Sequence, residues 1–182
     1  MSEMFSRRVF LRGLGVVAAA AALTACSSTN EAVNQALIEG AVGGIVAADC
    51  KIGRSRYWAA NATVPVNEIS FRIVMTNVSS KPVTLSGDNF ATTLDGTPIP
   101  PFNFSARDVG DADIWRTYDS LTIRPGEERS VALEYEINQS TYDSWYRSSR
   151  TVAVSFTCGN QRVTYTKNSR SDEITVSDIE TL

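Results

Sequence analysis

Thiol and imidazole chemistry is limited in this chain of 182 residues, which has three cysteines and no histidine. The lack of an imidazole excludes Ser-His-Asp and Cys-His nucleophile systems, histidine metal ligands and a histidine general base. The sequence also contains no Cys-x-x-Cys redox pair, no P-loop and no Gly-x-Ser-x-Gly motif. We therefore expect no catalytic residues, no cofactor and no enzymatic activity.

Acidic side chains that could do chemistry gather in one segment, residues 98–120. Asp108, Asp111 and Asp113 lie close together there, and Asp119 follows them. Two carboxylates can hydrolyse a glycosidic bond, but nothing in this spacing marks one as the acid and another as the base. Their oxygens could bind Ca²⁺, but the spacing lacks the ligand positions and the closing glutamate of an EF-hand loop. We expect a solvated acidic turn and no metal site.

Two aromatic clusters are candidates for a binding surface. The first lies in the proline-rich segment 98–120, which we interpret as a long loop, and such loops in compact domains are often functional. The second lies in residues 141–150. Tyrosine, tryptophan and arginine often anchor protein interfaces. The candidate residues are Phe102, Phe104, Trp115, Tyr118, Tyr142, Trp145, Tyr146 and Arg147. The alternative for the second cluster is that Trp145 fills the core while the tyrosines cover its rim.

Alternating apolar and polar residues predict the strands that position these clusters. In EISFRIVMTN, residues 68–77, one face carries the apolar side chains Ile69, Phe71, Ile73 and Met75. The same period of two recurs in SVALEYEIN, residues 130–138, and in TVAVSFTC, residues 151–158. The dipeptide Gly159-Asn160 then predicts a hairpin turn into the next strand. Short alternating strands separated by turns indicate a mainly β chain that forms a single antiparallel sandwich.

The start of the chain has the organisation of an export signal. Arg7 and Arg8, followed by Phe10 and Leu11, resemble the twin-arginine signal, in which a receptor reads the guanidinium pair. The apolar run over residues 14–23 has about half of the roughly twenty residues that a membrane-spanning helix needs. It is therefore typical of a signal peptide and not of a permanent span.

The apolar run ends in Leu23-Thr24-Ala25-Cys26, which resembles a bacterial lipobox. In that motif the cysteine is diacylated and becomes the first residue of the mature chain. This resemblance implies that Cys26 carries the lipid anchor, which attaches the protein to the membrane without spanning it. The alternatives are an ordinary signal with an incidental cysteine, or a cytosolic chain with an apolar helix.

These features predict three parts of the chain. Residues 1–25 form the signal peptide, and residues 26–44 hold the lipidated cysteine, a polar tether and a short helix over 31–39. Residues 45–182 form the sandwich domain. The mature chain would keep 14 basic and 19 acidic residues, a net charge of −5, which argues against a nucleic-acid partner. We expect a lipid anchor in the cell membrane, with the domain on the extracytoplasmic face, or in the outer membrane if the organism has one.

The other two cysteines lie in the mature domain. Cys50 and Cys158 are 108 positions apart, and Cys158 falls on the apolar face of its strand. In an oxidising compartment, a bridge across so long a loop could stabilise the fold by about 4 to 5 kcal/mol. We therefore expect a disulfide between Cys50 and Cys158. The alternative is a pair of separately buried free thiols.

The motifs FRIVMTNVSSKPVTL, residues 71–85, and LTIRPGEERSVALEYEI, residues 121–137, resemble a broad group of bacterial lipoproteins with immunoglobulin-like domains of unknown function. The resemblance implies an immunoglobulin-like sandwich in which Asn77 makes turn hydrogen bonds, and it implies no particular activity. Two hypotheses follow for the function. The domain is a binding module for a protein or an extracellular ligand, or it is an accessory or structural subunit of a cell-envelope complex.

Overall fold

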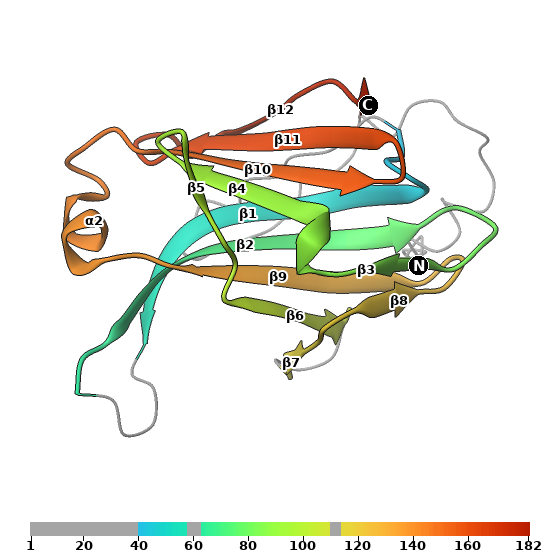
Figure 1. Ribbon diagram of the computed structural model, residues 1–182, viewed down its shortest axis with the longest axis horizontal. Helices are drawn as coiled ribbons and strands as arrows, with labels where there is room; N and C mark the ends of the chain where they lie inside the picture. Colours follow the sequence, from blue (N-terminus) through green and yellow to red (C-terminus); the bar gives the residue numbers. More distant parts are fainter. Residues whose placement is uncertain (1–39, 58–62, 110–113) are drawn as a thin grey trace, which may run out of the picture.

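The computed structural model describes residues 40–57, 63–109 and 114–182, which form an antiparallel β-sandwich with one short α-helix in the described part (Figure 1). The signal peptide, Cys26 and the helix expected over 31–39 lie outside the described residues. The elements are β1 (Ile45–Tyr57), β2 (Val66–Asn77), β3 (Val83–Leu85), the 3₁₀-helix η1 (Gly87–Asn89), β4 (Phe90–Leu94), β5 (Thr97–Ile99), β6 (Asn103–Asp108), β7 (Arg116–Thr117), β8 (Leu121–Ile123), β9 (Glu128–Glu136), α2 (Gln139–Ser144), β10 (Thr151–Cys158), β11 (Gln161–Asn168), β12 (Ile174–Val176) and β13 (Glu180–Thr181).

The strand order confirms the immunoglobulin-like sandwich. One sheet has the order β1-β2-β9-β6-β7, and the facing sheet has the order β12-β11-β10-β4-β5, with β13 also paired to β11. Strands β1-β2-β9-β6 correspond to the A, B, E and D strands of an immunoglobulin domain, and β4, β10 and β11 correspond to C, F and G. The small pair of β3 and β8 completes the described strands.

The predicted alternation of β2, β9 and β10 is confirmed by the core. Ile69, Phe71, Ile73 and Met75 of β2 are at most 1% exposed. Phe71 joins the two sheets, because its ring centroid lies 5.4 Å from that of Tyr165 on β11 and 6.1 Å from that of Phe90 on β4. The predicted hairpin is also present, with Cys158 paired to Gln161 across the two-residue turn.

The long loop expected over residues 98–120 is wrong. The segment contains β5, β6 and β7, and β6 pairs along its whole length with β9. Phe104 and Ala106 of β6 alternate into the core, and each is at most 6% exposed. Pro100 and Pro101 carry the chain from one sheet to the other between β5 and β6. Neither proline has an N–H to donate, so this crossover loses no ladder hydrogen bond.

Asn77 fixes the end of the sandwich at which β1 begins. Its side-chain amide donates to the carbonyls of Lys81 and Ile123, and its side-chain oxygen accepts from Ser79. Its backbone carbonyl also accepts from Gly126, in the turn before β9. The residue is fully buried, so these bonds satisfy its polar groups where water cannot reach them. This confirms the turn role that the family resemblance implied for Asn77.

The predicted disulfide is wrong, because both Cys50 and Cys158 are free thiols in the structure. The sulfur of Cys158 lies 3.8 Å from the carbonyl oxygen of Gly43, just before β1 begins. Cys50 lies five positions beyond Ile45, about 16 Å farther along an extended strand. A disulfide requires Cα atoms within about 7 Å, so the two cysteines point into the sandwich at different levels. The structure has the alternative arrangement, two separate thiols.

Thiol titration should show this arrangement directly. In a Cys26→Ser chain purified without reductant, we expect Cys158 to react slowly in the folded state, because it is half-buried. Cys50 should react only after unfolding, because it is fully buried and burial raises the pKa of its thiol. Adding Cys158→Ser should leave one thiol that is protected until denaturant is added. Denatured protein with no titratable thiol would contradict the structure.

Candidate functional site

The eight aromatic and arginine residues that the sequence proposed as one surface take different positions. Phe104 and Trp145 belong to the core, at 6% and 2% exposure. For Trp145 the alternative interpretation is therefore the right one, because its ring fills the core. Tyr118 and Tyr142 pack half-buried against that core. Phe102, Tyr146 and Arg147 are exposed, and Trp115 is half-buried. The structure therefore separates the residues around α2 from those around β6 and β7 (Figure 1).

The helix α2 closes one end of the sandwich. Asn138 caps it, because its side-chain oxygen accepts a hydrogen bond of 2.8 Å from the N–H of Thr141. Trp145 follows the last turn and inserts its ring into the core. These two residues fix the helix so that Tyr142 packs half-buried against the core, while Tyr146 is 62% exposed.

Two arginines of β1 stack on Tyr142 of α2 and on Tyr146, which follows the helix. The guanidinium carbon of Arg54 lies 4.2 Å from the ring centroid of Tyr142 and 4.5 Å from that of Tyr146. The guanidinium carbon of Arg56 lies 4.1 Å from the Tyr142 centroid. Arg54 also donates to the carbonyl of Tyr142. Such contacts between cations and rings are worth about 0.5 to 2 kcal/mol each, so together they hold both rings in place.

A β-bulge in β1 aims these arginines at α2. The pairing with β2 shifts between Ala48 and Lys51, and Asp49 there has a positive φ of 50°. Ala47 faces the core before the bulge, and Ile52 faces it after the bulge, so the inward face changes from odd to even positions. Arg54 and Arg56 continue that inward face past the end of the core. Without the bulge they would face away from α2.

A chain of polar contacts joins β1, β2 and α2 beneath the stack. Arg56 donates to the side chain of Asn67 at 2.7 Å, and Asn67 donates to Gln139 at 3.1 Å. Gln139 in turn donates to Asp143 at 2.7 Å, and Asp143 pairs with Arg56 at 3.4 Å. This closed set of contacts holds α2 against both strands.

A second contact ties α2 to the turn between β4 and β5. Arg150 donates to the carboxylate of Asp95 at 2.7 Å and to the hydroxyl of Ser144 at 3.1 Å. Asp95 also accepts from the N–H of Thr151 at 2.8 Å. The hydrogen bond from Arg150, and then that from Thr151, lower the pKa of the Asp95 carboxyl.

We define the α2 surface by the cationic and aromatic residues gathered at this end of the sandwich. Its members are Arg54, Arg56, Tyr142, Tyr146, Arg147 and Arg170. Arg147 and Arg170 are exposed, and Arg170 donates to the backbone carbonyl of Arg147. Within the described residues, neither forms an ion pair. The α2 surface therefore presents rings and unpaired positive charge together.

Sequence reasoning missed Arg54, Arg56 and Arg170. The spacing Arg-x-Arg places Arg54 and Arg56 on one face of a strand, and this was the available signal. It could not show which face, because the bulge at Asp49 decides that.

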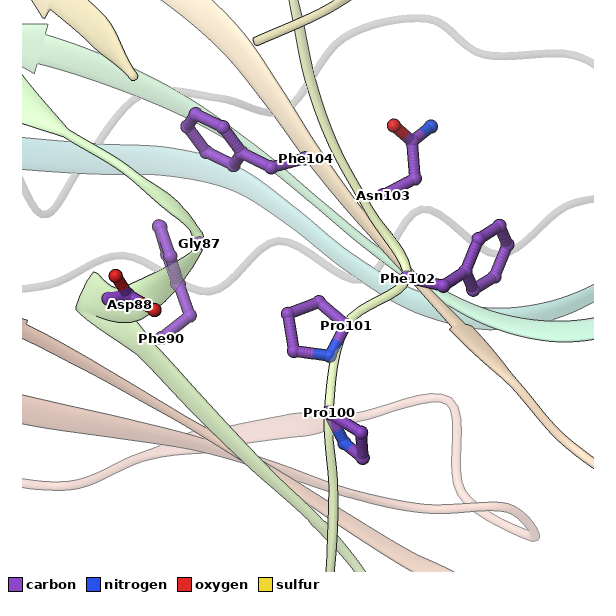
Figure 2. Close-up of a pocket in the computed structure, with 8 residues that line it drawn as sticks. All are labelled: Gly87, Asp88, Phe90, Pro100, Pro101, Phe102, Asn103 and Phe104. Atoms are coloured by element: carbon purple, nitrogen blue, oxygen red, sulfur yellow. The ribbon is translucent and has the colours of Figure 1, made fainter. Parts of the chain in front are cut away.

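The other region holds a shallow groove of about 490 Å³ where the chain crosses from β5 to β6 (Figure 2). Its lining residues are Gly87, Asp88, Phe90, Pro100, Pro101, Phe102, Asn103 and Phe104. Phe90 and Phe104 are core side chains, and the ring of Phe102 points away from both (Figure 2). The side chain of Asn103 bonds to Glu134 and Thr117, so Asp88 is the one charged side chain among the lining residues, which is less than the several polar groups that converge in a typical small-molecule site.

Trp115 lies elsewhere, on the outer face of the first sheet. Its ring centroid lies 5.0 Å from the guanidinium carbon of Arg107 and 5.6 Å from that of Arg72. In the described ranges, no group of three or more acidic or cysteine side chains could hold a metal ion. Asp111 and Asp113 of the predicted acidic turn lie outside the described residues. None of the helices in the described ranges is long and apolar enough to span a membrane.

No protein-family model and no curated protein matches the chain. Among solved structures, an uncharacterised β-sandwich protein of Clostridium difficile 630 is 15% identical, with a TM-score of 0.46, covering 81% of this chain and 99% of that one. A protein of Bacillus subtilis proposed to be a lipoprotein (ycdA) is 10% identical, with a TM-score of 0.44, covering 76% of this chain and 39% of that one. A protein of unknown function from Listeria monocytogenes EGD-e is 11% identical, with a TM-score of 0.40, covering 66% of this chain and 70% of that one.

The free energy of unfolding should depend on pH through the carboxyl group of Asp95. Its folded pKa is lowered, so its contribution is present above the ordinary value of 3.8 and is lost as pH falls through the folded pKa. We expect Asp95→Asn to be less stable than the natural chain near neutral pH, with the difference shrinking in acid. Urea unfolding at a series of pH values measures it. Arg150→Gln should reduce the same pH-dependent difference, whereas a difference that stays constant into strong acid would refute the pairing.

Proposed function

We propose that the protein is a membrane-anchored extracytoplasmic lipoprotein whose sandwich is a non-enzymatic interaction module, and that it meets its partner through the α2 surface. The anchor is Cys26, and the export route is the one that Arg7 and Arg8 resemble. The exclusion of histidine chemistry and of the common catalytic motifs supports a binding role.

The observation that carries the proposal is the position of the α2 surface relative to the start of the domain. The described chain begins at Gly40, and β1 starts beside Asn77 and the turn at Gly126. Strand β1 then runs 13 residues, about 40 Å, to the opposite end, where α2 lies (Figure 1). The described chain therefore enters the sandwich at one end and presents the α2 surface at the other, which favours an anchor on the side away from that surface.

The strand edges favour an interaction through side chains over the alternative, a subunit held by its edges. The bulge at Asp49 interrupts the edge strand β1, and the edge strand β5 has three residues with Pro98 at its centre. The other edge strand of the sheet that contains β1 is β7, which has two residues, and the other edge strand of the sheet that contains β5 is β12, which has three. Bulges, prolines and short strands are the features that block edge pairing. A partner is therefore better received at the α2 surface than at a sheet edge.

Photo-crosslinking in cells tests the proposal. A photoreactive benzoylphenylalanine replaces Tyr146, or in the matched control Arg124, which is exposed in the turn at the other end of the sandwich. We expect a discrete adduct from position 146 in the membrane fraction and no such adduct from position 124.

The same experiment in a Cys26→Ala background tests the anchor. The protein should leave the membrane fraction or accumulate as an unprocessed precursor, and the adduct should fall by about tenfold as the effective concentration at the membrane is lost. A normally processed and membrane-bound Cys26→Ala protein would contradict the anchor. Equal adducts from positions 146 and 124 would contradict the role of the α2 surface.

A further inference from the structure

We propose that the α2 surface recognises an acidic segment of a partner protein, with carboxylates at Arg147 and Arg170 and an apolar side chain on the ring of Tyr146. The proposal rests on the proposed function and specifies the chemistry of the partner. Three features of the surface lead to it: its charge, its rigidity and the kind of cation that it uses.

Two arginines beside the exposed ring of Tyr146, Arg147 and Arg170, form no ion pair within the described residues. The complete sequence has a net charge of −3, yet five arginines surround α2: Arg54, Arg56, Arg147, Arg150 and Arg170. Ion pairs compensate two of them, since Asp143 pairs with Arg56 and Asp95 pairs with Arg150. The guanidinium groups of Arg147 and Arg170 thus keep positive charge that no carboxylate of the described residues contacts, and this local charge favours an anionic group of a partner.

The aromatic part of the surface is ordered before any partner binds. Tyr146 is 62% exposed, but Arg54 stacks on its ring and also on the half-buried ring of Tyr142. An exposed ring held in this way loses little conformational entropy on binding. Ordered tyrosines beside arginines are typical of the residues that carry the binding energy of protein interfaces.

The cations of the α2 surface are all arginines. A guanidinium group offers a planar fork that matches a carboxylate with two parallel hydrogen bonds, whereas an ammonium group acts as a point charge. An inorganic or polymeric phosphate would also meet the fork, but it offers nothing apolar to Tyr146. The combination of an exposed ring with two guanidinium groups that form no ion pair within the described residues therefore fits an acidic peptide segment better than a phosphate chain.

Binding of a defined probe tests the inference on the protein purified from membranes in detergent. The probe is a fluorescein-labelled dodecapeptide of three Glu-Glu-Leu-Asp repeats, and its lysine-for-glutamate version is the negative control. We expect saturable binding that weakens as salt is raised. The double variant Arg147→Glu/Arg170→Glu should weaken binding by about tenfold or more, and Tyr146→Ala should weaken it by about fivefold.

Two further variants keep the result interpretable. Arg124→Glu makes the same charge change at the opposite end and should leave binding unchanged. Arg147→Lys/Arg170→Lys keeps the charge and removes the forks, so it should weaken binding by about threefold. Circular dichroism melting of each variant checks that the sandwich is folded.

Three outcomes would overturn the inference: no binding of the acidic peptide, equal binding by the charge-reversed surface, or displacement by inorganic polyphosphate at lower charge concentration than by the unlabelled peptide. If the crosslink from position 146 still forms, the proposed function stands and the partner is not acidic protein. If that crosslink is absent, the proposed function itself fails, whatever the peptide does.

Discussion

The contact of Phe71 with Tyr165 and Phe90 is the interaction on which the sandwich depends. Phe71 comes from the central region of one sheet, and its two ring partners come from the other. Phe90 in turn lies 5.1 Å from Phe156 and 6.3 Å from Phe104, measured between ring centroids, so the aromatic contacts reach both sheets again. Because these side chains must alternate into one core, they constrain the register of the five strands that carry them, β2, β4, β6, β10 and β11.

The bulge in β1 links the packing of the core to the α2 surface. Up to Ala47 the strand follows one alternation, and from Cys50 onward it follows the other. The shift lets Cys50 and Ile52 fill the core and then brings Arg54 and Arg56 against the ring of Tyr142 in α2. One backbone irregularity thus couples packing in the middle of the sandwich to the cationic stack at its end. The other end is fixed separately, by the hydrogen bonds of buried Asn77.

The parts of the fold that could be predicted are those in which the residues of a single strand or hairpin form a local pattern. The alternation of Ile69, Phe71 and Ile73 is regular, and the hairpin at Gly159-Asn160 is local, so both could be predicted. Strand β6 could not, because its buried residues Phe104 and Ala106 stand among prolines and polar residues that are typical of loops.

Which residues meet at the candidate site, and whether the two cysteines meet, depends on how distant segments of the chain pack together. Spacing along the chain does not encode how far one sheet is displaced along the other, so Cys50 and Cys158 both face inward without meeting. For the site, Tyr142 and Tyr146 could be selected by residue type. Their partners Arg54 and Arg56 could not be selected, because these contacts depend on the bulge in β1 and on the packing of α2 against that strand.

We propose that a lipid on Cys26 holds the domain so that the α2 surface lies at the end farthest from the bilayer. Energy transfer measures this in vesicles that carry the lipidated protein and acceptor-labelled lipids, with a donor dye at position 146 or at position 124. Because β1 extends about 40 Å between the two ends, transfer from position 146 should be clearly weaker than from position 124. Equal transfer from the two positions, or stronger transfer from position 146, would contradict this placement of the α2 surface.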